Sequence, residues 1–244
     1  MNRISDAMEL GAADPAAEQA GSGGEGIDLC VDNKSFGLRM MDTSDGRNSA
    51  SVLINKMYAW RGYSGDHQLA EDPNRITLAA RDKQGQTVGT LTLGIDTPQG
   101  IMADQIFKEE IDAHRARGAK VCEITKLAFD PNVQSRETMA SLFHLSVMYA
   151  RDIHHCTDLF IEVNPRHRRF YQHMLGFTQQ GQPKNNPRVN APAYLLWVSF
   201  TYVTQQIQAL GGKGAAATNE RSFYPMFFSE REEQGILHRL RDIH

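Results

Sequence analysis

Two charged residues stand inside an apolar stretch that otherwise has the character of a buried strand. The stretch KVCEITKLAFDP, residues 120–131, contains Glu123 and Lys126 and ends at Pro131. An ionised side chain inside a core strand costs free energy unless it is paired or hydrated. A carboxylate in a half-buried position has a raised pKa and can act as a general base, and a nearby lysine could pair with it or hold an anionic group. The alternative is that both residues are edge charges that face water.

A second group of residues that could have a function consists of clusters of basic residues. Arg166, Arg168 and Arg169 lie within four residues of one another, and Arg115 and Arg117 precede the strand described above. The whole chain has a net charge of −3, so these clusters stand out locally. Basic patches of this kind steer the encounter with an acidic partner, although solvated helix faces are the common explanation of charge runs.

Several other chemistries find no support in the sequence. The nine histidines form neither an HxxxH nor an HExxH pattern, so we expect no metal site. Cys30, Cys122 and Cys156 lack the spacing of metal ligands and indicate reduced thiols in a cytoplasmic protein. The slightly negative charge argues against nucleic-acid binding, and no apolar run approaches the roughly 18 residues of a membrane span. The N-terminus has no apolar segment of the signal-peptide type.

The elements that position these residues alternate in type. Strands are predicted at residues 36–41, 75–82, 87–95, 120–131, 158–163 and 193–203, the last with a short helix at its end as an alternative. Helices are predicted at residues 103–117, 135–154, 166–175 and 229–241, with a further helix that ends at Gly62. Residues 83–86 form a hairpin turn between two of the strands. A hairpin followed by strands that alternate with helices predicts an α/β or α+β fold with a mixed sheet.

The chain divides into three parts. Residues 1–26 are rich in Ala, Gly, Glu and Ser and contain no aromatic residue, so we expect them to be disordered. Residues 27–210 form one domain. Residues 211–244 comprise a flexible linker, 211–217, and a C-terminal helical tail.

One segment carries a resemblance to a known superfamily. Residues 164–177, NPRHRRFYQHMLGF, place the pattern Asn-x5-Phe-Tyr-x4-Gly-Phe directly after an apolar strand. This pattern resembles the last conserved helix of GNAT-superfamily acyltransferases, while VGTLTL resembles the third strand of that fold and KLAFDP its fourth. Residues 36–200 follow the superfamily's order of elements. The resemblance implies a GNAT-like mixed central sheet flanked by helices.

The same resemblance bears on the acyl donor, because a motif of the superfamily is altered here. Ordinary members have a turn of the form Gln/Arg-x-x-Gly-x-Gly/Ala, whose small residues let backbone N–H groups approach the pyrophosphate of coenzyme A. Counted from Pro131, the Gln falls on Gln134 and the small positions fall on Glu137 and Met139. Glu137 would repel a pyrophosphate, and Met139 would hold the backbone away. We therefore expect no permanently bound cofactor and a donor carried on the phosphopantetheine of acyl carrier protein, with acyl-CoA as the alternative.

A narrower resemblance agrees with this expectation. DTPQGIMADQIFKEEI, residues 96–111, together with EITKLAFDP resembles the centre of acyl-homoserine-lactone synthases and of the related long-chain N-acyl amino acid synthases. The lactone synthases carry arginines where this chain has Lys126 and Thr92. Their absence argues against S-adenosylmethionine and lactone formation, so the N-acyl amino acid synthases are the closer resemblance.

The resemblance implies a role for each candidate residue. Glu123 would take a proton from the α-amine of an amino acid. A β-bulge would bring Lys126 onto the same side, where it could hold the acceptor carboxylate or pair with Glu123. Tyr171 would protonate the leaving thiolate, with helix packing as the alternative. The donor arm would meet the backbone of Leu127, Ala128 and Phe129, and its phosphate would meet Gln134, Arg136 and Asn164.

The acyl chain and the carrier protein require further surfaces. Burial of each methylene contributes about 0.8 kcal/mol, so a deep apolar slot would favour long chains. Candidates for its lining, which are more often simply core residues, are Ile106, Phe107, Phe143, Met148 and Trp197. Residues 222–228, SFYPMFF, could close this slot or bury themselves elsewhere. The five arginines of the basic clusters would contact the acidic carrier protein.

These observations predict a cytoplasmic acyltransferase that moves a fatty acyl group from acyl carrier protein to the α-amine of an amino acid, with peripheral membrane association through its product. One alternative is an acetyl-CoA-dependent N-acetyltransferase of a small molecule or protein. Another is a non-catalytic acyl-binding or scaffold protein, which an inaccessible Glu123 would favour. The sequence does not name the amino acid, the acyl chain length or the oligomeric state.

Overall fold

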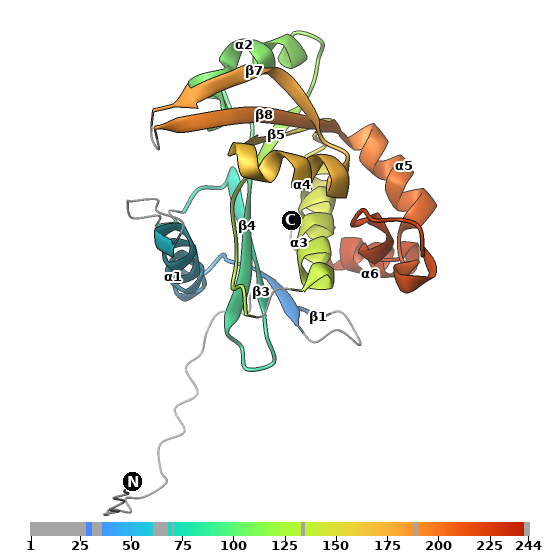
Figure 1. The fold of residues 1–244 in the computed structure, drawn as a ribbon. Coiled ribbons are helices and arrows are strands. Elements are labelled where there is room, and N and C mark those ends of the chain that lie inside the picture. Colours follow the sequence, from blue (N-terminus) through green and yellow to red (C-terminus); the bar gives the residue numbers. More distant parts are fainter. Residues whose placement is uncertain are drawn as a thin grey trace, which may run out of the picture.

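The computed structural model describes residues 28–30, 36–60, 68–69, 71–132, 135–187 and 190–241 (Figure 1). The segment 1–26, predicted to be disordered, lies outside the described residues. So does Gly62, the predicted end of the first helix.

A single mixed sheet organises the described residues. Its eight strands run in the order β1-β2-β3-β4-β5-β6-β8-β7. The strands are β1 Asp28–Cys30, β2 Gly37–Met40, β3 Arg75–Arg81, β4 Thr87–Ile95, β5 Val121–Phe129, β6 Asp158–Val163, β7 Thr178–Asn186 and β8 Ala191–Ser199. Only β5 and β6 pair in parallel, and all other neighbours are antiparallel. The mixed sheet that the sequence predicts is therefore confirmed.

The helices begin and end at residues with clear local signals. They are α1 Ser44–Trp60, α2 Asp104–Arg115, α3 Arg136–Met148, α4 Pro165–Leu175, α5 Phe200–Leu210 and α6 Glu230–Arg241. Ser135 caps α3 by accepting a hydrogen bond from the Thr138 N–H at 3.0 Å, and a short π-helix, Tyr149–Ile153, continues α3. Gly176 ends α4 with a φ of 75°, a conformation that glycine adopts without strain.

Helices cover both faces of the sheet. In Figure 1, α1 lies on one side of the β3–β4 hairpin and α3 on the other, with α5 and α6 beside α3. The main core surrounds α3 and includes Leu78, Leu91 and Ile124. A second core lies under α2, where Phe107 and Ile111 contact Phe160 of β6.

Two strand predictions need correction. Residues 178–186, TQQGQPKNN, form β7, which the sequence analysis does not predict because the segment is polar and contains Gly and Pro. The strand predicted at 193–203 ends at Ser199, whose side chain accepts a hydrogen bond from the Tyr202 N–H at 3.2 Å. This cap starts α5, so the last predicted strand residues are helical.

The C-terminal extension, residues 211–241, packs against α3. The predicted flexible linker turns back at once, since the Gly212 N–H donates to the Phe227 carbonyl at 2.9 Å. The ring of His144 stacks on Phe227 and Phe228, and its Nδ1 accepts the Phe228 N–H at 2.9 Å. The aromatic run therefore buries itself on α3. None of the helices in the described part of the chain has the length and apolar character needed to cross a membrane.

Candidate active site

The site is built around the point where β5 separates from β6. β5 pairs with β4 along its length, but with β6 only from Val121 to Glu123. Among the described residues, the remaining edge of β5, residues 124–129, has no strand partner on the β6 side. Such an edge can pair with an extended ligand arm through its backbone. The predicted donor residues lie on this edge, and the side chains of Ala128 and Phe129 are buried.

A β-bulge interrupts β5, as the resemblance predicts. The register with β4 shifts between Thr90 and Thr92, and Lys126 has a φ of 50°. The Thr90 hydroxyl donates to the Lys126 carbonyl at 3.1 Å. The bulge turns Lys126 to the face that α1 covers, where its Nζ donates to the Gln68 carbonyl at 3.1 Å. Burial, together with the charge of Arg75, lowers the pKa of Lys126.

Glu123 is more deeply buried than the half-buried position that the sequence suggests. The residue is only 2% exposed. Its two carboxylate oxygens accept hydrogen bonds from the N–H groups of Met102 at 2.7 Å and Ala103 at 3.1 Å. Burial raises the pKa of this carboxyl, while the two backbone N–H groups and Arg75 act in the opposite direction. Glu123 therefore also anchors the segment between β4 and α2, residues 96–103, at its end next to α2.

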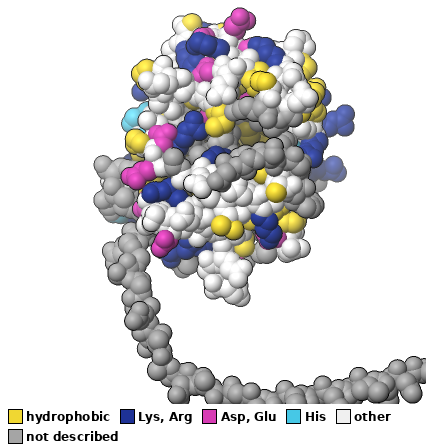
Figure 2. Space-filling view, turned by 90° about the vertical axis from the view of Figure 1, so that its left-hand side faces the viewer, with side chains coloured by type: hydrophobic (Ala, Val, Ile, Leu, Met, Phe, Trp, Pro, Cys, Tyr) yellow, Lys and Arg dark blue, Asp and Glu magenta, His cyan; other side chains and the backbone are white. Residues whose placement is uncertain are grey.

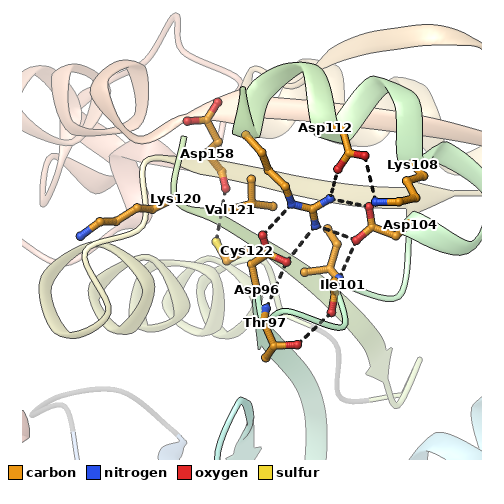
Figure 3. Close-up of polar contacts among 12 residues, drawn as sticks. Asp96, Thr97, Ile101, Asp104, Lys108, Asp112, Lys120, Val121, Cys122 and Asp158 are labelled. Carbon is orange, nitrogen blue, oxygen red and sulfur yellow. Dashed lines mark hydrogen bonds and ion pairs between the residues drawn. The ribbon is translucent and has the colours of Figure 1, made fainter. Parts of the chain in front are cut away.

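Arg115 holds the other end of that segment to α2. Asp96, Asp104 and Asp112 converge on its guanidinium at 2.6 to 2.8 Å (Figure 3). The hydrogen bond with Asp104 is the main cause of the raised pKa of Arg115. The prediction that Arg115 docks a carrier protein is therefore wrong, because three carboxylates already surround its charge. Arg117 is exposed, and its docking role stays a prediction.

The two candidate residues near α4 have structural contacts. The ring of Tyr171 lies edge-on to Phe143 and Phe177, with centroids 6.3 Å and 5.9 Å away, and the residue is 6% exposed. Asn164 caps α4, because its Oδ1 accepts the Arg166 N–H at 3.2 Å. Their roles towards a thiolate and a phosphate stay predictions.

The first turn of α3 differs from the sequence-based expectation. Met139 is buried in the main core, so its side chain does not stand over the phosphate turn, and that prediction is wrong. Glu137 is exposed. Arg136 donates to the Arg221 carbonyl at 2.8 Å, and a groove of about 570 Å³ separates this turn from the extension. The phosphate contact of Arg136 stays a prediction, and Gln134 lies outside the described residues.

The predicted acyl slot is divided between two cores. Phe143 and Met148 belong to the main core around α3. Phe107 belongs to the core under α2, against which Ile106 and Trp197 pack. The sheet lies between these cores, so the five residues cannot line one slot. Periodicity identifies apolar positions, but it does not say which side of the sheet a helix covers.

The basic residues of α4 differ in exposure. Arg166 and Arg169 are exposed. Arg168 is partly buried, because its guanidinium lies 4.8 Å from the centroid of the Tyr194 ring and donates to Gln179 Oε1 at 3.1 Å. On the face seen in Figure 2, basic and acidic side chains are interspersed.

Arg75, the first residue of β3, adjoins the site but is not among the residues predicted from the sequence. The register sets Arg75 opposite Gly94, which is opposite Glu123. The alternation of Thr90 and Thr92 along β4 is a signal that could have indicated a polar sheet face. Cys122 and Cys156 are free and buried, and within the described ranges no group of three or more His, Cys, Asp or Glu residues could hold a metal ion.

Comparison with known proteins gives concordant results. The sequence model of the N-acyl amino acid synthase FeeM matches residues 49–199. The structure of FeeM, an N-acyl amino acid synthase from uncultured soil microbes, aligns with a TM-score of 0.62 and 31% identity over 68% of this chain and 90% of that chain. No curated protein matches the sequence.

A more distant match concerns the fold alone. A proposed N-acetyltransferase from Lactobacillus plantarum aligns with a TM-score of 0.50 and 14% identity, over 68% of this chain and 99% of that chain. The GNAT-like fold is thereby confirmed, and the chain is an N-acyltransferase that belongs to the FeeM family of N-acyl amino acid synthases.

Proposed function

We propose that this enzyme transfers a long acyl chain from the phosphopantetheine of acyl carrier protein to the α-amine of an amino acid. The observation that carries the proposal is the juxtaposition of a buried carboxylate, Glu123, with the unpaired edge of β5 that begins at the next residue. An extended thioester arm paired with this edge would bring its carbonyl close to a proton acceptor.

The reaction requires a proton balance that these residues could provide. The acceptor ammonium loses one proton before attack, and its nitrogen then forms a bond to the thioester carbon while the C–S bond breaks. A carboxylate oxygen has two lone pairs, so each Glu123 oxygen keeps one acceptor position beside the N–H that it binds. Glu123 takes this first proton directly or through water. As the amide forms, the nitrogen releases a second proton, which replaces the one that Tyr171 supplies to the thiolate. A β5 amide polarises the carbonyl.

The first turn of α3 supports the choice of acyl carrier protein as the acyl donor. Exposed Glu137 puts a negative charge where a CoA pyrophosphate would approach the positive end of the helix dipole. A phosphopantetheine brings one phosphate, and its carrier protein supplies most of the docking surface. The exposed arginines of α4, Arg166 and Arg169, suit the acidic surface of such a carrier.

Product analysis tests the reaction. Lipid extracts of a bacterium that expresses the chain should contain N-acyl amino acids that an empty-vector strain lacks, and their masses identify both substrates. Purified enzyme should then use acyl carrier protein with a kcat/KM well above that for the matching acyl-CoA. Equal kcat/KM values for the two donors would contradict the carrier assignment. Transfer of acetyl groups alone would favour the acetyl-CoA alternative.

A further inference from the structure

The face of the sheet that carries Glu123 contains two adjacent rows of residues that lie opposite one another on β3, β4 and β5. The rows are Arg75, Gly94 and Glu123, and Thr77, Thr92 and Thr125. Directly opposed residues point to the same face of a sheet, and so do residues two positions apart along a strand. Most strand positions buried under helices are apolar, so this face is unusually rich in polar groups.

One polar atom of this face has no partner. The Thr77 and Thr92 hydroxyls lie 2.8 Å apart and bond each other. The Thr125 hydroxyl oxygen is buried and has no hydrogen-bond partner among the residues that the structure describes. A buried hydroxyl without a partner destabilises a protein, because it gives up its hydrogen bonds to water and forms none in return. A hydroxyl retained at such a position suggests that a ligand group completes its hydrogen bonding.

Charged side chains of β3 and β5 share this face with the hydroxyl. The Glu123 carboxylate accepts two backbone N–H groups, and its side chain lies directly over Gly94, where an added Cβ would lie 3.1 Å from Glu123 Cγ. Arg75 reaches the surface and pairs with Asp72 at 3.3 Å. Lys126 bonds a backbone carbonyl and, within the described part of the chain, no carboxylate. The ammonium of Lys126 therefore faces this site without a carboxylate partner among the described residues, and the partly exposed Arg75 adjoins it, so an anionic ligand group would find two cations here.

We infer that Arg75 and Lys126 bind the carboxylate of the amino acid acceptor and that the Thr125 hydroxyl contacts its α-amine beside Glu123. This assignment rests on the proposed function and names the part of the acceptor that the enzyme recognises. A guanidinium binds a carboxylate through two parallel hydrogen bonds, whereas a neutral amide forms weaker ones. The unpaired edge of β5 lies next to this face, so the amine would face the thioester.

Kinetics with two acceptors test the assignment. The wild-type enzyme should prefer the best amino acid over the corresponding amino acid amide, which lacks the carboxylate charge. Arg75→Gln should raise the KM for the amino acid roughly tenfold to hundredfold, and should change the KM for the amide little. Arg75→Lys should give an intermediate value. Lys83→Gln, at the exposed far end of the same hairpin, is the matched control and should leave both values unchanged.

A second variant gives an independent reading. Thr125→Val removes the hydroxyl that lacks a partner, so the melting temperature should stay the same or rise while calorimetric affinity for the amino acid falls. Equal KM changes for the acid and the amide in Arg75→Gln, or unchanged amino acid affinity in Thr125→Val, would overturn the assignment while the proposed function stands. A wild-type enzyme that acylates no amino acid would overturn both.

Discussion

At the scale of single residues, Glu123 has two tasks that one substitution affects together. Its carboxylate holds the Met102 and Ala103 N–H groups, and burial raises its pKa, which makes it a better proton acceptor. Beyond burial and these two N–H groups, the charges of Arg75 on β3 and Glu162 on β6 have smaller and opposite effects on its pKa. A base must be ionised to work, so activity should rise with pH through a value above the ordinary 4.5.

Glu123→Gln separates the two tasks by their pH dependence. If Glu123 is the base, kcat at neutral pH should fall about 10²- to 10⁴-fold, and the loss should shrink as pH rises and more of the amine is already unprotonated. The limb of the kcat/KM profile that Glu123 sets should be replaced by one that follows the ionisation of the acceptor amine. Glu109→Gln, an exposed carboxylate on α2, is the control. A loss that is the same at every pH, accompanied by a lower melting temperature, would mean that Glu123 only anchors α2.

At the scale of elements, the bulge in β5 makes the site possible. It keeps β5 paired with β4 while it turns Lys126 to the face of Glu123. The conformation has a cost, because a φ of 50° brings the Cβ of an L-residue close to its own backbone. A strained backbone at a candidate site is consistent with a functional requirement for the lysine side chain.

Two substitutions at Lys126 distinguish strain from charge. Lys126→Gly relieves the positive φ, so its free energy of unfolding should stay within about 1 kcal/mol of wild type or increase. Lys126→Met keeps the strain and should be less stable than Lys126→Gly. Both variants should raise the KM for the amino acid by similar factors, since both remove the ammonium. A glycine variant that binds the acceptor as well as wild type would show that the lysine does not contact it.

At the scale of the whole molecule, the surface near α4 is the candidate contact for the carrier protein. Arg166 and Arg169 project from the start of α4, where the positive end of the helix dipole disfavours cations by a few tenths of a kcal/mol each. Arg168 packs on Tyr194 instead, so its reversal would disturb packing as well as charge. Only the two exposed arginines give a clean test of docking.

The double variant Arg166→Glu and Arg169→Glu should raise the KM for acylated carrier protein several-fold or more. The kcat with a donor that consists of the acylated pantetheine arm alone should not change. Wild-type affinity for the carrier should fall as salt rises, because exposed charges are screened over about 10 Å at 0.1 M. Arg231→Glu on α6 is the control. A salt-independent KM would place the docking surface elsewhere, with Arg117 as the next residue to reverse.

Local signals explain how much of the fold could be predicted. The hairpin turn at 83–86, the Ser135 cap and the Gly176 stop depend on residues close in sequence, and each predicted boundary lies near the observed one. β7 could not be predicted in this way, because its polar residues show no apolar alternation. It is a strand because β8 offers its edge for pairing.

The sequence by itself determined the order of elements from β2 to α4, the family resemblance and the importance of the strand that carries Glu123 and Lys126. Only the tertiary structure decided what those side chains face. Arg115 lost its predicted docking role because Asp96, directly after β4, and Asp104, at the opposite end of α2, both bind its guanidinium. Arg75 became a candidate only because the register sets it across Gly94 from Glu123. Local patterns record the propensities of neighbouring residues, whereas burial, charge pairing and pKa depend on residues that the fold brings together from distant parts of the chain.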